Sequence, residues 1–222
     1  MFPIRDDQTS KNSIYIELRR SIIMGHHKPN DRFDVAVIAK KYSTSITPVR
    51  DALQMLSQEG LINIKPRSGY FVASTTLKQL RDLMELRHIL ELAAIEHAVL
   101  RITTEQIKEL RSVHAGYTGD DDVSYDRYTD ENRHFHYLIA KASGNLDLAQ
   151  LVARLHDRLA RFMVMRQAGK TMLDTHKIII DALEAHNADA AKEALLDDIE
   201  RSHESILDKV LQKEELESSY IG

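Results

Sequence analysis

Two hydroxyl side chains and one guanidinium, all able to bind phosphate or base edges, stand close together in the run Ser45-Ile46-Thr47-Pro48-Val49-Arg50. Either Ser45 or Thr47 is expected to cap a helix, because both are favoured N-cap residues and Pro48 fits the first turn. The N-terminus of a helix attracts phosphate, and Arg50 in the first turn can bind a guanine edge or hold a phosphate. The run therefore predicts a contact with DNA, and the alternative is that Arg50 is a solvated surface charge.

The rest of this helix and the segment after it extend the same surface. Arg50 and Gln54 fall opposite an apolar stripe made of Val49, Ala52, Leu53 and Leu56. The helix is expected to continue to about residue 59, and residues 61–64 and 70–73 are predicted to be short strands. The hairpin between them carries Arg67, which can enter or border the minor groove, and the flexible Gly69. For Arg67, too, a solvated surface charge is the alternative.

The elements that would position these side chains begin upstream. Apolar residues at helical spacing predict a first helix over residues 11–24, and a second, short helix is expected over residues 34–42. Three helices followed by a hairpin is the order of a winged helix-turn-helix. Residues 1–75 are therefore predicted to form a DNA-binding domain.

A second group of side chains that could bind a metal lies on apolar helix faces further along the chain. Asn132 and His136 are one helical turn apart. His176 is in line with Ile180 and Leu183, and Asp198 with Ala191, Ala194 and Leu195. A carboxylate on an apolar stripe costs several kcal/mol unless it is paired or ligated. From spacing alone a hydrogen-bonded polar cluster is the more common outcome, and His203, which shares a face with Ile199 and Ile206, is either a further ligand or structural.

Helices are also expected throughout the region that holds this second group. All four prolines precede residue 67, and helices are predicted over about 77–101, 104–114, 123–142, 146–168, 171–186 and 188–213, with a frayed tail. A short polar joint at residues 74–76 precedes them. The fold is therefore expected to be mainly α, with residues 76–222 forming an all-helical domain.

Composition narrows the classes of function. The chain has no cysteine, which excludes disulfides, thiolate metal ligands and a cysteine nucleophile, and no apolar run approaches the length of a membrane span. A cytoplasmic protein without membrane contact is expected. Residues 1–75 carry 11 Lys and Arg against 7 Asp and Glu, although the whole chain has a net charge of −4. A basic module joined to an acidic one suits a protein that meets phosphates at one end, unless the asymmetry arises by chance.

The segment 33–72 resembles the GntR family of bacterial regulators. The resemblance is carried by three runs in order, SITPVRDAL, LSQEGLI and PRSGYFV. It implies that the helix beginning at Ser45 is the recognition helix and that Arg50 reads DNA. Ile46 stands where the family often has arginine, which suggests either contact with a thymine methyl group or weaker base reading.

The second region resembles the FCD effector domain of the FadR-like branch of that family, through QLRDLMELRHILELAAIEHAVL, FHYLIAKASGN and THKIIIDALEAHNADAAKEALL. Six helices are typical of its VanR-type subgroup. The resemblance implies a divalent metal held at positions 132, 136, 176 and 198. Here Asn132 replaces an Asp and Asp198 replaces a His, whereas His136 and His176 match. The paired changes keep two imidazoles, one carboxylate and one further oxygen donor, which suit Zn²⁺, Mn²⁺, Ni²⁺ or Fe²⁺.

The same resemblance implies a small organic acid as effector. Arg87 matches an arginine that faces the family's cavity and could clamp a carboxylate, although an ion pair with Glu91 one turn away is equally expected. The resulting hypothesis is a homodimeric transcriptional regulator, not an enzyme, that binds operator DNA under effector control. Two alternatives remain: a metalloenzyme with a two-His-one-carboxylate iron site, and an architectural DNA-binding protein without an effector.

Overall fold

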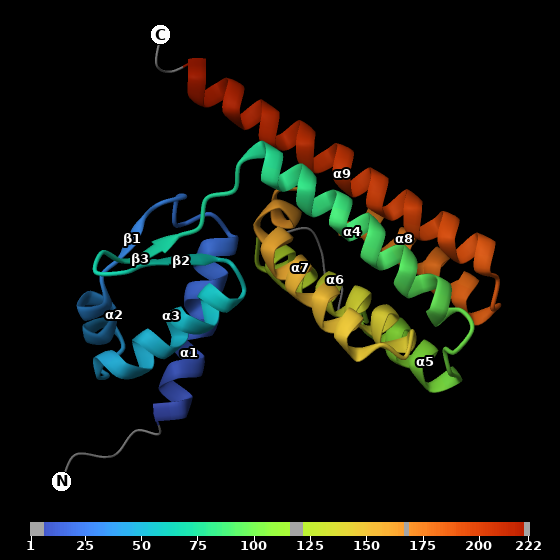
Figure 1. Ribbon diagram of the computed structural model, residues 1–222, viewed down its shortest axis with the longest axis horizontal. Coiled ribbons are helices and arrows are strands. Elements are labelled where there is room, and N and C mark those ends of the chain that lie inside the picture. Colours follow the sequence, from blue (N-terminus) through green and yellow to red (C-terminus); the bar gives the residue numbers. More distant parts are fainter. Residues whose placement is uncertain (1–6, 116–121, 167–168, 220–222) are drawn as a thin grey trace. The chain divides into compact units, whose positions relative to one another are not determined.

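The computed structural model describes residues 7–115, 122–166 and 169–219. The chain divides into two compact units, Met1–Leu77 and Lys78–Gly222, each with its own arrangement of elements (Figure 1).

The first unit contains three helices and a small sheet. They are α1 (Asp7–Ile23), β1 (Arg32–Phe33), α2 (Val35–Lys41), α3 (Ile46–Gln58), β2 (Ile62–Lys65) and β3 (Gly69–Val72). Helix α3 packs on α1 through the predicted stripe of Val49, Ala52, Leu53 and Leu56, which is fully buried. Asp34 caps α2 by accepting hydrogen bonds from the backbone N–H groups of Ala36 and Val37. Ser45 is the N-cap of α3, but its side chain makes no capping hydrogen bond.

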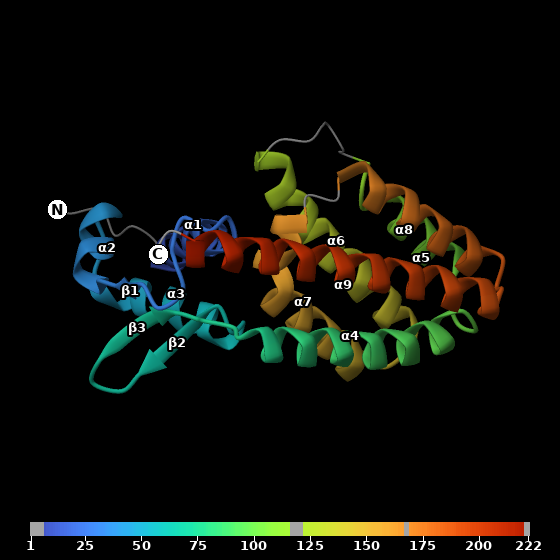
Figure 2. The same cartoon turned by 90° about the horizontal axis from the view of Figure 1, so that it is seen from above.

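The sheet has the antiparallel strand order β1-β3-β2. The β2–β3 hairpin was expected, and it projects away from α1 and α2 as a wing (Figure 2). Its turn is closed by a hydrogen bond from Ser68 N–H to the Lys65 carbonyl, and Arg67 and Gly69 adopt positive φ angles of 62° and 117°. Strand β1 was not expected, because two residues are too few to show alternation; Arg32 pairs with Phe71 of β3.

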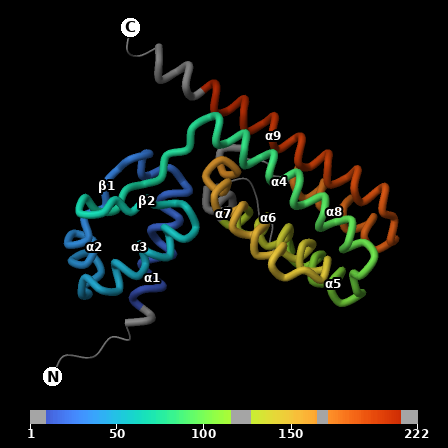
Figure 3. Tube along the Cα trace, in the orientation of Figure 1, coloured from blue at the N-terminus to red at the C-terminus, as the bar shows by residue number. Residues whose placement is uncertain are grey.

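The second unit is all helical. Its elements are α4 (Leu77–Ala98), α5 (Thr104–Ser112), α6 (Asp122–Ala142), α7 (Leu146–Arg166), α8 (Gly169–Glu184) and α9 (Ala188–Ser219), and Figure 3 traces their path. The predicted fold class is therefore confirmed. The expected frayed tail after residue 213 is wrong as far as Ser219, because α9 continues through strong helix formers without a glycine or proline.

Helix α9 returns beside α4, as Figures 1 and 2 both show. The largest apolar core gathers side chains from α4, α5, α6, α8 and α9, among them Phe135, Ile179 and Leu195. A second apolar cluster joins α4 and α7 to the middle of α9 through Leu80, Leu159 and Ile206. No helix among the described residues is long and apolar enough to cross a membrane.

Candidate functional site

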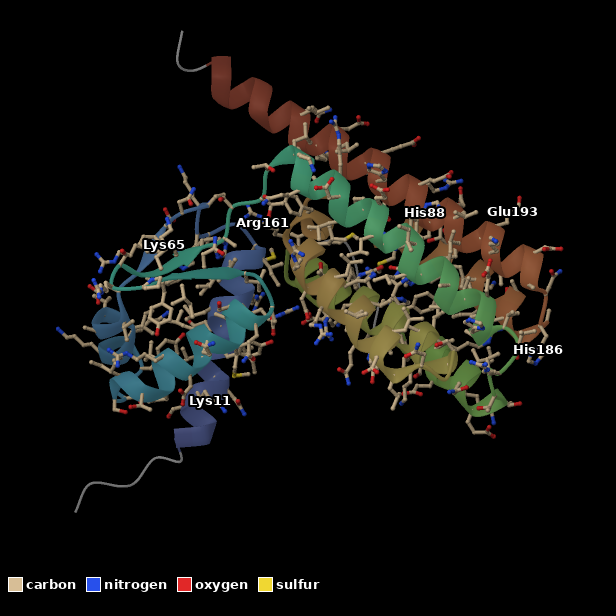
Figure 4. All side chains as sticks on the ribbon, viewed as in Figure 1. Lys11, Lys65, His88, Arg161, His186 and Glu193 are labelled. Carbon is tan, nitrogen blue, oxygen red and sulfur yellow. The ribbon has the colours of Figure 1, made fainter. Side chains whose placement is uncertain are left out.

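The predicted DNA-reading residues lie at the surface of the first unit. Ser45, Thr47, Arg50 and Gln54 are exposed on α3, and Arg67 is exposed at the tip of the wing. Arg50 and Ile46 share one groove with the wing residues Lys65, Arg67 and Gly69. Figure 4 labels Lys65 at the hairpin. The groove thus brings α3 and the wing together, whereas Ser45, Thr47 and Gln54 extend the exposed face of α3 beside it.

Arg32 of β1 is a basic residue that the sequence reasoning missed. It lines the same groove, and its guanidinium lies against Gly69, where an added Cβ would be 3.4 Å from Arg32 Nε. The groove therefore holds arginines from three elements. In the sequence, Arg32 is marked only by its place two residues before Asp34, the N-cap of α2. Strand β1 itself is too short to recognise.

The second unit contains a buried polar site centred on Arg87 of α4, whose side chain is 0% exposed. Its Nε donates to Glu91 Oε1 at 2.8 Å, and its Nη2 donates to Asp198 Oδ2 of α9 at 2.9 Å. Nη2 also lies 3.2 Å from Nε2 of His136. The expected Arg87–Glu91 pair is present, but Arg87 simultaneously contacts two of the predicted metal ligands.

Electrostatics make this arrangement an ionised network. Burial opposes the charge of Glu91, but the Arg87 guanidinium, with a hydrogen bond from His136, outweighs it and holds the pKa of Glu91 well below its usual value. Burial likewise opposes the charge of Arg87, but Glu91 and Asp198 outweigh it and raise the pKa of Arg87. The guanidinium and the Glu91 carboxylate are therefore both charged at neutral pH.

Three other histidines, His114, His156 and His176, are held neutral instead. Burial lowers the pKa of His156 to about 4 and lowers that of His176 well below its usual value. Burial also lowers the pKa of His114, which lies in the turn after α5. A neutral imidazole has one N–H donor and one lone pair, so the neighbours of each ring decide which nitrogen could bind a metal.

His136 presents Nε2 toward the site. Its Nδ1 lies 2.7 Å from Glu91 Oε2, a pure acceptor, so Nδ1 carries the proton. The lone pair is then on Nε2, which faces Asp198 Oδ2 at 3.6 Å. A carboxylate behind a histidine is the support that metal-binding histidines usually have.

His176 is oriented the same way by a longer relay. Glu131 Oε2 is 3.0 Å from Nδ1 of His114, and His114 Nε2 is 2.8 Å from Nδ1 of His176. Because the Glu131 carboxylate can only accept, Nδ1 of His114 carries the proton, and Nε2 of His114 accepts from Nδ1–H of His176. The lone pair of His176 is therefore on Nε2. That buried atom is 4.0 Å from Asp198 Oδ1 and has no hydrogen-bond partner among the described residues.

Asn132 occupies a different part of the site. Its Nδ2 lies 3.4 Å from Nδ1 of His156, and His156 Nε2 lies 2.7 Å from Glu91 Oε1. The amide can donate to the histidine lone pair, which a carboxylate at position 132 could not do. The side-chain oxygen of Asn132 is then the atom with which this residue can ligate a metal.

The donor set fits a divalent metal. Ligand atoms of His136, His176 and Asp198 lie within 4.8 Å of one another, and a second such group joins Glu91, His136 and His156. Two imidazoles with a carboxylate suit zinc and other first-row ions. Sequence reasoning missed the metal-site roles of Glu91, His114, Glu131 and His156. His156 gave a signal as a polar residue in the apolar stripe of Val152 and Leu159, and Glu91 was expected only as the ion-pair partner of Arg87.

Comparisons with known proteins agree with this division of the chain. Residues 10–72 match the model of the bacterial regulatory proteins of the gntR family, and residues 82–201 match the FCD domain. The chain is 28% identical over 193 residues to the uncharacterized HTH-type transcriptional regulator YdhC of Bacillus subtilis, covering 82% of this chain and 84% of YdhC. It is 26% identical over 205 residues to the HTH-type transcriptional repressor RspR of Escherichia coli, covering 90% of each protein.

Solved structures show the same fold. McbR/YncC of E. coli superposes with a TM-score of 0.71 at 21% identity, covering 92% of this chain and 98% of that one. A GntR-type regulator from Rhodococcus sp. RHA1 gives 0.66 at 24% identity, covering 90% and 98%. The relatives are transcriptional regulators by name and not enzymes, so the metalloenzyme alternative has no support from them.

Proposed function

The chain belongs to the GntR family of transcriptional regulators with a C-terminal FCD domain, and from this we propose that it binds operator DNA as a homodimer under the control of a small organic acid. The groove between α3 and the wing is the DNA-binding surface. Ser45 and Thr47 bind phosphate, Arg50 and Gln54 read bases, and Arg67 with Gly69 at the wing tip borders the minor groove. These roles also set the working boundaries: residues 1–75 bind DNA, and residues 76–222 bind the effector and dimerise.

The observation that carries the DNA part is the exposed guanidinium of Arg50, the fifth residue of α3, in one groove with Lys65 and Arg67. A helix whose N-terminal residues are free to reach bases is how helix-turn-helix proteins bind the major groove. The side chain of Ser45 makes no capping bond and so can donate to a phosphate.

Arg87 carries the effector part of the proposal. Its Nη1 is buried and has no hydrogen-bond partner among the described residues. An unsatisfied guanidinium nitrogen inside a protein is costly, and a carboxylate ligand would satisfy it with a charge-assisted hydrogen bond. This supports an organic acid as the ligand of Arg87.

Beside the acid we propose a divalent ion, Zn²⁺, Mn²⁺ or Ni²⁺, on His136, His176, Asp198 and the oxygen of Asn132. The ion would polarise a ligand oxygen, and Glu91 and Glu131 keep the two histidines in the tautomer that can bind it. We assign the chain to the VanR-type subgroup on its six described helices α4–α9, and we expect a cytoplasmic protein.

The test of the DNA part begins by selecting duplexes from a random pool and measuring affinity by fluorescence anisotropy. We expect a two-fold symmetric selected sequence. Arg50→Ala should weaken binding to it by about 1–3 kcal/mol, roughly 5- to 150-fold. Arg111→Ala, an exposed arginine of α5 in the other unit, is the control. Unchanged binding by R50A would show that the recognition helix is misplaced, and equal binding to all duplexes would favour an architectural protein.

A further inference from the structure

We propose that Arg87 acts as the resident cation of the buried site, so that a divalent metal binds only when the guanidinium leaves Asp198 and His136. This inference rests on the metal part of the proposed function. It makes Arg87 the residue that sets metal affinity, in addition to its contact with the effector.

Arg87 and a metal need the same electron pairs. Nη2 of Arg87 donates to Asp198 Oδ2 at 2.9 Å and lies 3.2 Å from Nε2 of His136. Nε2 carries the one lone pair of that ring, because Nδ1 faces Glu91. A lone pair that accepts the guanidinium hydrogen cannot also ligate a metal, so the two states of His136 exclude each other.

The balance of charge in the buried site also sets Arg87 against a metal. One guanidinium faces two buried carboxylates, Glu91 and Asp198. A buried carboxylate without a partner is strongly destabilising, so Arg87 stabilises the metal-free fold. A divalent cation at Asp198 would replace the guanidinium as its counter-charge, whereas a cation added beside a fixed guanidinium would be repelled by it.

Arg87 also has a second carboxylate partner besides Asp198. Nε of Arg87 donates to Glu91 Oε1, one helical turn away, independently of Asp198. Because the guanidinium is a rigid plane, it can leave Asp198 and remain paired with Glu91 only if the Glu91 side chain moves with it. Nη1 has no hydrogen-bond partner among the described residues, so a movement of the guanidinium breaks no hydrogen bond of Nη1.

The experiment compares metal binding by wild type and Arg87→Met, both stripped with a chelator, by titration calorimetry with Ni²⁺ alone. Met keeps the length and apolar stem without the charge. We expect the variant to bind Ni²⁺ at least about tenfold more tightly, since repulsion and competition are removed. Its melting temperature should fall in chelator and recover with Ni²⁺.

The matched control is Arg111→Met. Arg111 also pairs with two carboxylates, Asp181 and Glu184, but at the surface. Arg111→Met should bind Ni²⁺ with the affinity of wild type, and its melting temperature should respond to Ni²⁺ as that of wild type does. If the Met variant is insoluble, Arg87→Gln replaces it, with the same expected direction.

Equal or weaker Ni²⁺ binding by a folded Arg87 variant would overturn the inference, and so would the absence of binding in both proteins. Operator binding by the same wild-type preparation separates these failures from the proposed function. If operator binding persists, the proposed role as a DNA-binding regulator is kept, and only the proposal about the buried site is wrong.

Discussion

At the scale of single residues, the buried site depends on which ring nitrogen of each histidine carries a proton. Glu91 fixes His136, and Glu131 fixes His176 through His114. None of these contacts needs a charged histidine, and burial keeps His156 and His176 neutral. The site should therefore not tolerate protonation of His156 or His176.

This predicts acid sensitivity with a defined direction. The pKa of His156 falls from 6.5 in the unfolded chain to about 4 in the folded protein, so the unfolded state takes up the proton first. Stability is fully present above pH 6.5 and is lost as the pH falls toward 4. By pH 5 the loss from this residue is roughly 2 kcal/mol. Glu91, whose pKa is depressed, adds a further loss only below its unfolded value of 4.5.

The measurement is urea unfolding of metal-free protein at pH 7.5 and 5.0. His156→Gln should be less stable at pH 7.5, because it loses its bond to Glu91, but should lose less stability on acidification. His97→Gln, an exposed histidine of α4, is the control. Identical pH dependence in H156Q and wild type would refute the role of His156.

At the scale of elements, the wing depends on two residues with left-handed backbone. Arg67 has φ 62° and Gly69 has φ 117°. The second value lies outside what side chains with a Cβ readily adopt, and Arg32 lies against the same glycine. The hairpin can hold its tip beside α3 only if position 69 remains glycine.

Gly69→Ala is therefore expected to strain the hairpin by about 1–3 kcal/mol and to weaken operator binding. Circular dichroism should show unchanged helix content, because α1–α3 pack without the hairpin tip. Ser68→Ala is the matched control, since the neighbouring residue has no positive φ. If G69A and S68A bind operator equally well, the wing tip makes no contribution to the complex.

At the scale of the whole molecule, charge is divided between the units. The first 75 residues are basic on balance, whereas the chain as a whole has a net charge of −4. Phosphates are thus attracted to one unit and repelled by the other. For a ligand in the helical unit to control DNA binding, the two sites must be coupled, and coupling between binding sites is reciprocal.

We expect metal to change operator affinity by roughly 5- to 150-fold, the usual range of allosteric coupling, and operator to change metal affinity by the same factor. His176→Ala should hold less metal than wild type after purification without chelator or metal-affinity resin, and its operator affinity should not respond to Ni²⁺. Sedimentation of wild type should give a dimer. Equal operator affinity with and without bound metal would mean that the ion is structural and does not signal.

The sequence by itself determined the order of elements and the surface of α3. A stripe such as Val49, Ala52, Leu53 and Leu56 can be buried in only one way, so Arg50 and Gln54 had to face outward. Pairing within a helix was also visible, because Arg87 and Glu91 are one turn apart. These features depend on local periodicity, which a sequence shows directly.

Only the tertiary structure decided what surrounds Arg87. Residues from α4, α6, α7, α8 and α9 meet there, and spacing within one helix says nothing about a partner on another. Asp198 could equally have faced a metal alone. The structure instead places it against a guanidinium, because a buried carboxylate needs a counter-charge and Arg87 is the cation that the fold brings within 2.9 Å.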